Sequence, residues 1–133
     1  MILPFNPNPT KQLVRNTLSF YRRGELSPEG AFGLIASAAR GSGDPEALYH
    51  YGTFLIEGIG CEENPEEGIK ALVRSANGGD TQAMLDLGEY YLRGEVVEQN
   101  TALALEWFEC AHSSGDERGS EWLLYVYSIL SSQ

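Results

Sequence analysis

The sequence predicts an all-α fold made of stacked two-helix units, and three observations support this prediction. Gly-Asp pairs recur every 36 residues, at Gly43-Asp44, Gly79-Asp80 and Gly115-Asp116. The apolar residues between these pairs follow the three- and four-residue spacing of a buried helix face, and no segment alternates as a strand does. A repeat of this length is typical of helical arrays, in which one unit cannot bury its apolar face alone.

Each expected helix begins at a recognisable capping sequence. Ser27-Pro28-Glu29, Asp44-Pro45-Glu46 and Asn64-Pro65-Glu66 each combine a side-chain N-cap, a proline at the first helical position and an acid near the positive end of the helix dipole. Asn8-Pro9 begins in the same way, while Asp80, Asn100 and Asp116 cap without proline. We therefore expect seven helices, over residues 9–23, 28–41, 45–57, 65–77, 81–93, 101–113 and 117–131.

These helices group into a single domain, residues 1–133, with units at about 9–43, 44–79 and 80–115 and a final helix at 116–131. We expect the final helix to cap the stack, covering apolar surface that the third unit would otherwise expose. Gly52 and Gly88 lie in the middle of helices, where glycine costs about 1 kcal/mol relative to alanine. We interpret both as sites where a neighbouring helix or side chain approaches the backbone closely.

Charge is distributed unevenly along the chain, whose net charge is −10. Residues 1–43 carry five basic and two acidic side chains, a net charge of +3, whereas the remainder carries four basic and 17 acidic side chains, a net charge of −13. An acidic surface disfavours nucleic acids and anionic membranes and favours a partner with a basic surface. The alternative interpretation is that most of these acids only keep the outer helix faces soluble.

No feature of the sequence indicates export or insertion into a membrane. Residues 1–9 lack a basic start, an apolar stretch and a cleavage site, and no later segment is apolar enough to span a bilayer. The two cysteines, Cys61 and Cys110, do not make a disulfide framework. We expect two free thiols in the reducing environment of the cytoplasm.

The residue types that could carry chemistry do not form a catalytic or metal-binding pattern. His50 and His112 lie in different units, and neither has a histidine or cysteine partner at the spacing of a metal site. Gly58-Ile59-Gly60 follows a helix rather than a strand, which excludes a phosphate-binding loop. We therefore expect no enzyme, with no catalytic residue, metal or cofactor, and keep an unrecognised active site in a groove as a remote alternative.

The unit at residues 80–115 resembles the Sel-one-like repeat (SLR), a relative of the tetratricopeptide repeat. Nine of its residues match the pattern of that repeat: Ala83, Leu87, Gly88, Tyr91, Gly94, Ala104, Trp107, Ala111 and Gly115. The unit at residues 44–79 matches less completely, because Ala71 stands where the tryptophan belongs, and residues 9–43 resemble a degenerate unit. The resemblance implies a right-handed α-α superhelix, or solenoid, with an adaptor role. It also implies that Trp107 lies in the core between helices.

Some secreted members of this family carry a cysteine pair inside each repeat, and this sequence lacks that pair, which argues against an exported member. If the first helix of each unit lines the concave surface, as in tetratricopeptide arrays, the register predicts which side chains face it. This predicted groove mixes apolar centres with charges of both signs. Its residues are Arg15, Arg22, Tyr49, Thr53, Ile56, Glu57, Leu85, Glu89, Leu92, Arg93 and Tyr125.

The mixture of apolar and charged side chains in the predicted groove suits a protein–protein contact that has aromatic anchors and a polar rim. The alternative interpretation is that Tyr49, Leu85 and Tyr125 only fill the inner curvature of a tight superhelix. Our leading hypothesis is a bacterial, cytoplasmic module that binds another protein in this groove as an adaptor or regulator. The second hypothesis is an immunity or inhibitor protein that neutralises a toxin or effector by stoichiometric binding.

Overall fold

The structure of the protein, a computed structural model, describes residues 8–133. This part of the chain contains no strand, and its helices are α1 (Pro9–Arg22), α2 (Pro28–Ser42), α3 (Pro45–Glu57), α4 (Pro65–Asn77), α5 (Thr81–Arg93), α6 (Thr101–Ser113) and α7 (Glu117–Ser131). Only two predicted boundaries differ, because α1 ends one residue earlier and α2 one residue later than expected. Residues 1–7, assessed above for a signal sequence, lie outside the described residues.

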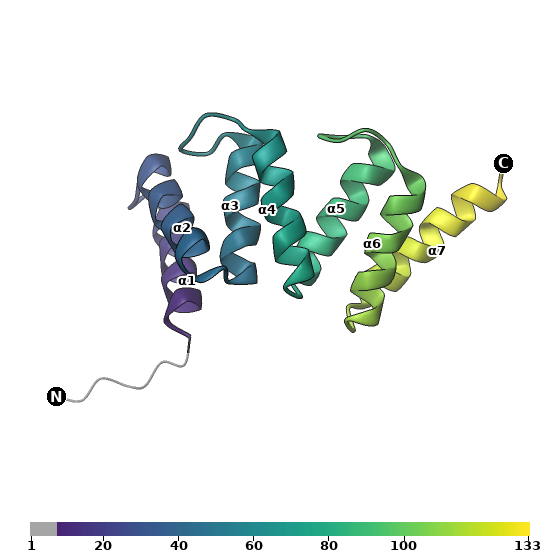
Figure 1. The fold of residues 1–133 in the computed structure, drawn as a ribbon, viewed down its shortest axis with the longest axis horizontal. Coiled ribbons are helices and arrows are strands. Elements are labelled where there is room, and N and C mark those ends of the chain that lie inside the picture. Colours follow the sequence, from purple (N-terminus) through teal and green to yellow (C-terminus); the bar gives the residue numbers. More distant parts are fainter. Residues whose placement is uncertain (1–7) are drawn as a thin grey trace.

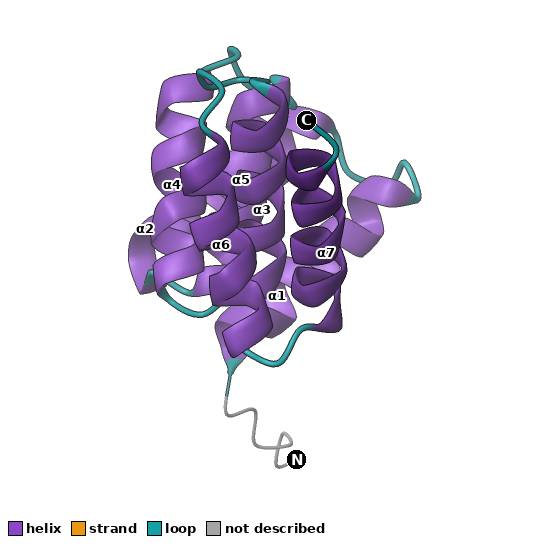
Figure 2. Cartoon of the chain, turned by 90° about the vertical axis from the view of Figure 1, so that its right-hand side faces the viewer, coloured by secondary structure: helices purple, strands orange, loops and turns teal. Residues whose placement is uncertain are grey.

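The helices stack side by side into an elongated array with α1 at one end and α7 at the other (Figure 1). Each helix packs against the next one along the chain, and α1 also contacts α3. Seen along the array, the second helices α2, α4 and α6 lie in one layer and the first helices α1, α3, α5 and α7 in the other (Figure 2). The predicted all-α solenoid of two-helix units with a terminal helix is therefore confirmed. No helix of residues 8–133 combines the length and the apolar character needed to cross a bilayer.

The helix boundaries follow from local chemistry, as the capping sequences predict. In α1 to α6 the side chain of the N-cap residue accepts a hydrogen bond from the backbone N–H three residues later, with N···O distances from 2.9 to 3.3 Å. In α7 the Asp116 side chain accepts from the N–H of Arg118 at 3.0 Å. Each bond satisfies a backbone donor that has no partner within its own helix.

The two helices of a unit approach each other at the mid-helix glycines, as expected. A Cβ atom on Gly52 would lie 2.7 Å from the carbonyl oxygen of Gly68 in α4. A Cβ atom on Gly88 would lie on the ring of Phe108 in α6, 2.7 Å from its Cδ1 and Cζ atoms. Close packing between the paired helices therefore requires glycine at these two positions, although glycine has a lower helix propensity than alanine.

Two clusters of buried side chains form the core. One joins α1, α2 and α3, and the other runs from the end of α3 to α7. In the second cluster Phe108 is fully buried and stacks on Trp122, with ring centroids 5.1 Å apart and an interplanar angle of 2°. Trp107, which the resemblance places in the core, is only partly buried at the edge of this cluster, so Phe108 fills the interior instead.

Candidate partner-binding groove

Polar contacts join the first helices of successive units along one side of the array. Arg15 of α1 forms an ion pair with Glu46 of α3 at 3.6 Å, and the Tyr49 hydroxyl of α3 donates a hydrogen bond to Asp86 Oδ2 of α5 at 2.7 Å. Burial raises the pKa of the Tyr49 phenol, and the neighbouring Asp86 carboxylate raises it further. The Tyr49 hydroxyl therefore remains a donor at neutral pH and fixes the position of α3 relative to α5.

A second set of contacts continues this row from α5 to α7. Gln82 donates from Nε2 to Asp86 Oδ1 at 2.8 Å and accepts at Oε1 from Arg118 Nη1 at 2.7 Å. Arg118 also donates to Asp116, and this contact lowers the pKa of the Asp116 carboxyl to about 2. The predicted groove residues did not include Asp86, although its spacing of four residues from Gln82 places the two on one helix face.

The predicted groove residues differ in exposure. Ile56 and Leu85 are core residues, with only 8% and 3% of their surface exposed, so they fill the inner curvature. Tyr49, Thr53, Glu89 and Leu92 are half-buried, and Arg15, Arg22, Glu57, Arg93 and Tyr125 are exposed. The structure brings Leu92, Arg93 and Tyr125 together at the C-terminal end of the array, whereas Arg15 and Arg22 lie on α1 at the other end.

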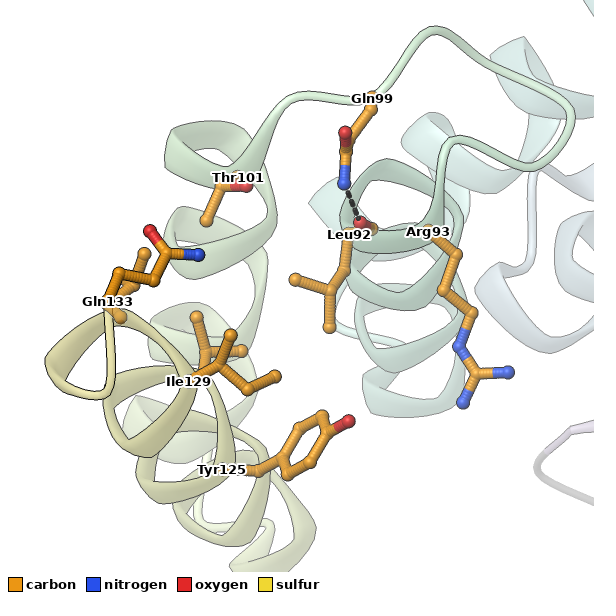
Figure 3. A pocket seen from close by; sticks show the side chains of 9 residues that line it. Leu92, Arg93, Gln99, Thr101, Tyr125, Ile129 and Gln133 are labelled. Atoms are coloured by element: carbon orange, nitrogen blue, oxygen red, sulfur yellow. Dashed lines mark hydrogen bonds between the residues drawn. The ribbon is translucent and has the colours of Figure 1, made fainter.

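A pocket of about 310 Å³ lies between α5 and α7 at this end. Tyr125 and Ile129 of α7 point toward Leu92 of α5 (Figure 3). Gln99, from the loop before α6, donates from Nε2 to the carbonyl oxygen of Leu92 at 2.8 Å, which ties the loop to the pocket wall. The remaining lining residues are Arg93, Thr101, Val126, Leu130 and Gln133. The pocket thus has an apolar wall with amide and hydroxyl groups beside it.

A second pocket of about 360 Å³ adjoins the first and shares Arg93 and Tyr125 with it. Its other lining residues are Glu121 and Trp122. The Arg93 guanidinium lies over the Trp122 ring at 5.9 Å, and Tyr125 meets the same ring edge-on with centroids 5.7 Å apart. Trp122 is not among the predicted groove residues, because its position matches Asp86 of the preceding unit and belongs to no repeat motif.

Acidic side chains gather next to these pockets, on α5 and in the loop that follows it. Asp86, Glu89 and Glu95, together with Tyr90, line a hollow of about 140 Å³. Burial raises the pKa of the Glu89 carboxyl, while the Arg93 guanidinium, at 3.8 Å, acts in the opposite direction. The described residues contain no group of three or more histidine, cysteine or acidic side chains arranged to hold a metal ion. The side chains along this side of the array therefore offer apolar contact, hydrogen bonding and negative charge.

The fold and the groove together define the class of this protein, an α-solenoid of two-helix repeats whose first helices line one surface. The family model of the Sel1 repeat matches residues 45–80 and 81–116, and the chain belongs to this family. Sel1 repeat proteins generally serve as protein–protein interaction modules and are typically non-enzymatic. The two matched segments follow the units predicted at 44–79 and 80–115 with an offset of one residue.

Solved structures of Sel1-like repeat proteins share the fold. A Sel1 repeat protein from Oxalobacter formigenes is 22% identical, with a TM-score of 0.75 over 86% of this chain and 49% of its own. A protective antigen of uropathogenic Escherichia coli strains is 24% identical, with a TM-score of 0.78 over 90% of this chain and 26% of its own. Helicobacter pylori cysteine-rich protein B is 19% identical, with a TM-score of 0.71 over 84% of this chain and 86% of its own. The chain thus spans about half of the first of these proteins and about a quarter of the second.

The cysteines of this chain are not paired in the structure. Cys61 lies half-buried in the loop between α3 and α4, and Cys110 is exposed on α6. Burial raises the pKa of the Cys61 thiol, which disfavours the reactive thiolate form.

Proposed function

We propose that this chain is a non-catalytic module that binds a partner protein in its concave groove, as an adaptor or regulator in the cytoplasm. The observation that supports this most directly is the pair of adjoining pockets between α5 and α7, which share Tyr125. Tyr125 is 53% exposed, and Trp122 supports it from the side. An exposed aromatic side chain between two pockets is the arrangement expected of an anchor in a protein–protein contact.

The partner that fits this site carries apolar side chains next to basic ones. The pocket in Figure 3 presents Leu92, Tyr125 and Ile129 to an apolar group. Glu121 borders the second pocket, and the acidic hollow on α5 lies next along the groove. A basic group on the partner would meet these carboxylates while its apolar neighbour enters the pocket. The acidic body from residue 44 onward would also speed the encounter with a basic surface.

Site-specific photo-crosslinking in cells tests where the partner binds. A photoreactive amino acid in place of Tyr125 is expected to capture a protein, because this position lies between the two pockets. The matched control places the same amino acid at Glu109, which is exposed on α6 in the other layer of helices. Capture at position 109 but not at 125 would contradict the proposal and assign binding to the outer layer.

Binding measurements with the captured partner then test the anchor. Tyr125→Ala combined with Leu92→Ala is expected to weaken binding by about tenfold or more, mainly through faster dissociation, because anchors act on the lifetime of a complex. Glu109→Ala is the control and should bind normally. An unchanged affinity of the double variant, with an intact helical circular dichroism spectrum, would exclude the groove as the site.

An immunity or inhibitor protein that covers the basic active site of a toxin is the second candidate. The carboxylates of Asp86, Glu89 and Glu95 on one stretch of the groove favour it. In this case the affinity itself should fall steeply with ionic strength, and Glu57→Lys with Glu89→Lys should reduce both the association rate and its salt dependence. An adaptor held mainly by apolar anchors should show a weak salt dependence.

A further inference from the structure

A pocket of about 570 Å³ lies at the edge of the array where the α3–α4 and α5–α6 loops project (Figure 1). We call it the loop-edge pocket; it lies between the start of α4 and the α5–α6 loop, and its lining residues are Pro65, Glu66, Ile69, Lys70, Val96 and Val97. Pro65, Ile69 and Val97 are half-buried, and Val96 is 44% exposed. The loop-edge pocket shares no residue with the two pockets between α5 and α7, so it is separate from the groove.

The preceding unit has the same junction in a closed form. Gly60 of the α3–α4 loop lies 36 residues before Val96, and both residues have a φ of +67°. Gly60 packs directly on the backbone of Pro28, the first residue of α2. The corresponding loop residue and helix start of the next unit, Val96 and Pro65, line the loop-edge pocket instead. The array thus closes this junction in one unit and leaves it open in the next.

Val96 occupies a turn that disfavours valine. The Val97 N–H donates to the Glu95 carbonyl oxygen at 2.7 Å, which closes a three-residue turn around Val96. A turn of this kind with a positive central φ is rare and strained, and the branched Cβ of valine has little conformational freedom to relieve the strain. Burial offsets the strain only in part, because the side chain is 44% exposed. Residues that a structure holds under strain cluster at binding sites and switches, which makes Val96 a candidate contact for a ligand.

Both ends of this loop are fixed to α5. The Glu95 N–H donates to the Tyr90 carbonyl oxygen at 3.1 Å, and the Asn100 N–H donates to the Tyr91 carbonyl oxygen at 2.8 Å. The wall that Val96 contributes is therefore formed before a ligand arrives, and binding orders little additional backbone.

Charge determines which kind of ligand fits the loop-edge pocket. The two segments that line it, residues 62–70 and 95–98, contain six glutamates and one lysine, a net charge of −5 within a chain of −10. The lysine, Lys70, lies 3.7 Å from a carboxylate oxygen of Glu66 and 3.4 Å from one of Glu67, so its charge is already offset. An apolar pocket with acidic surroundings complements an apolar side chain that has basic neighbours.

We propose that the loop-edge pocket is a second docking surface, which binds a segment of a partner protein in which a large apolar side chain is flanked by lysine or arginine. The apolar side chain contacts Ile69, Val96 and Val97, and its basic neighbours meet Glu66 and the adjacent glutamates. Because the loop-edge pocket and the groove have no lining residue in common, the chain can hold a protein segment at each of them at the same time.

Methyl NMR titration of the 133-residue chain tests this proposal. The probe is a peptide, acetylated and amidated at its ends, that has one leucine between two pairs of arginines. We expect saturable shifts of the Ile69, Val96 and Val97 methyl signals, with a dissociation constant of about 0.3 to about 3 mM. Alanine in place of the leucine should weaken binding by at least about fivefold, because less apolar surface is buried. Glutamates in place of the arginines should abolish it, because their charge repels the acidic surroundings.

Two substitutions in the chain test the contacts. Val96→Gly should weaken binding of the leucine peptide by at least about threefold, because the apolar wall is lost. Its melting temperature should not fall, since the change relieves the turn, so unfolding cannot explain the loss. Glu66→Lys, at a side chain that is 84% exposed, should also weaken binding by at least about threefold through charge repulsion. Leu34→Ala is the matched control, because Leu34 is an exposed leucine on α2, and it should bind as the unsubstituted chain does.

The methyl signals of Leu92 and Ile129 report on the groove in the same titration. Shifts confined to these two residues would overturn the loop-edge proposal while leaving groove binding intact. The absence of a saturable shift at Ile69 and Val96, or equal affinity for the leucine and alanine peptides, would also overturn it. Unchanged binding in both Val96→Gly and Glu66→Lys would do the same. The groove variant Tyr125→Ala should keep the shifts at Ile69 and Val96, because Tyr125 does not line the loop-edge pocket.

Discussion

At the scale of single residues, the distance between paired helices depends on the absence of a Cβ atom. Gly88 lies under the ring of Phe108, and this ring is fully buried and stacked on Trp122. The ring therefore cannot move away without opening the core. Gly33 of α2 is a mid-helix glycine of the opposite kind, because a Cβ atom there would meet nothing within 4 Å.

The first prediction compares alanine at these two glycines. Gly88→Ala should lower the free energy of unfolding by up to about 2 kcal/mol, since the overpacking cost of about 1–3 kcal/mol outweighs the gain in helix propensity of about 1 kcal/mol. Gly33→Ala should raise it by up to about 1 kcal/mol because only the propensity gain applies. Urea denaturation followed by circular dichroism measures both. Equal effects of the two changes would mean that α6 can move away from α5 at little cost.

The second prediction concerns His50, whose ring meets Tyr49 edge-on with centroids 5.1 Å apart. Burial lowers the pKa of His50 below its ordinary 6.5, although Glu46 partly opposes this and Arg22 adds to it. The unfolded chain therefore binds this proton at a higher pH than the folded chain does, and stability falls as the pH drops below about 6.5 until folded His50 is itself protonated. The melting temperature of His50→Gln should fall less steeply between about pH 7 and about pH 5. His112→Gln, which replaces the other histidine at an exposed site, is the control.

At the scale of elements, the loop between α3 and α4 and the loop between α5 and α6 share a left-handed backbone conformation at one position, which different residue types occupy. Gly60 and Val96 are in phase by 36 residues, and both have a φ of +67°. Gly60 touches the backbone of Pro28, where no Cβ would fit. Val96 is the one non-glycine residue with a positive φ among residues 8–133, and its side chain lines a pocket of about 570 Å³ with Pro65 and Ile69 of α4.

The third prediction follows from this strained valine. A left-handed conformation costs an L-residue about 1–2 kcal/mol, and a branched Cβ makes it less favourable still. Val96→Gly should remove this strain at an entropic cost of about 0.5–1 kcal/mol in the unfolded chain, so we expect a net stabilisation of about 0.5–1 kcal/mol. Val97→Gly lacks the strain to relieve and should destabilise. A lower melting temperature for Val96→Gly would mean that its contacts with α4 outweigh the strain.

At the scale of the whole molecule, stability depends on neighbours, because each helix packs mainly against the next. Helices α3 and α4 lie in the middle of the array and are covered on both sides, whereas α1 and α7 end it (Figure 1). In such arrays the energy is close to a sum of unit and neighbour contributions, so the ends open more easily than the centre.

The fourth prediction is a gradient of hydrogen exchange along the array. At low protein concentration, backbone amides of α3 and α4 should exchange most slowly and those of α7 most rapidly, with α1 between them or close to α7. Amide exchange measured by mass spectrometry resolves these segments. Uniform protection over residues 8–133 would show that the array opens only as a whole.

The sequence predicts the helices of this protein more completely than it predicts the groove. Helix boundaries such as those of α3 and α5 are predicted to the residue, because an N-cap and a helix-ending glycine act within one turn. The predicted groove residues include Tyr125, which is exposed, and Leu85, which is buried. The helix register alone made both positions equally plausible. The prediction omits Asp86 and Trp122, whose contacts come from other units.

The sequence by itself therefore determined the all-α class, the 36-residue unit, the helix ends and the mid-helix glycines, since each depends on local hydrogen bonds or on a period along the chain. Only the tertiary structure decided which inner residues remain exposed, because exposure depends on the curvature that successive units produce together.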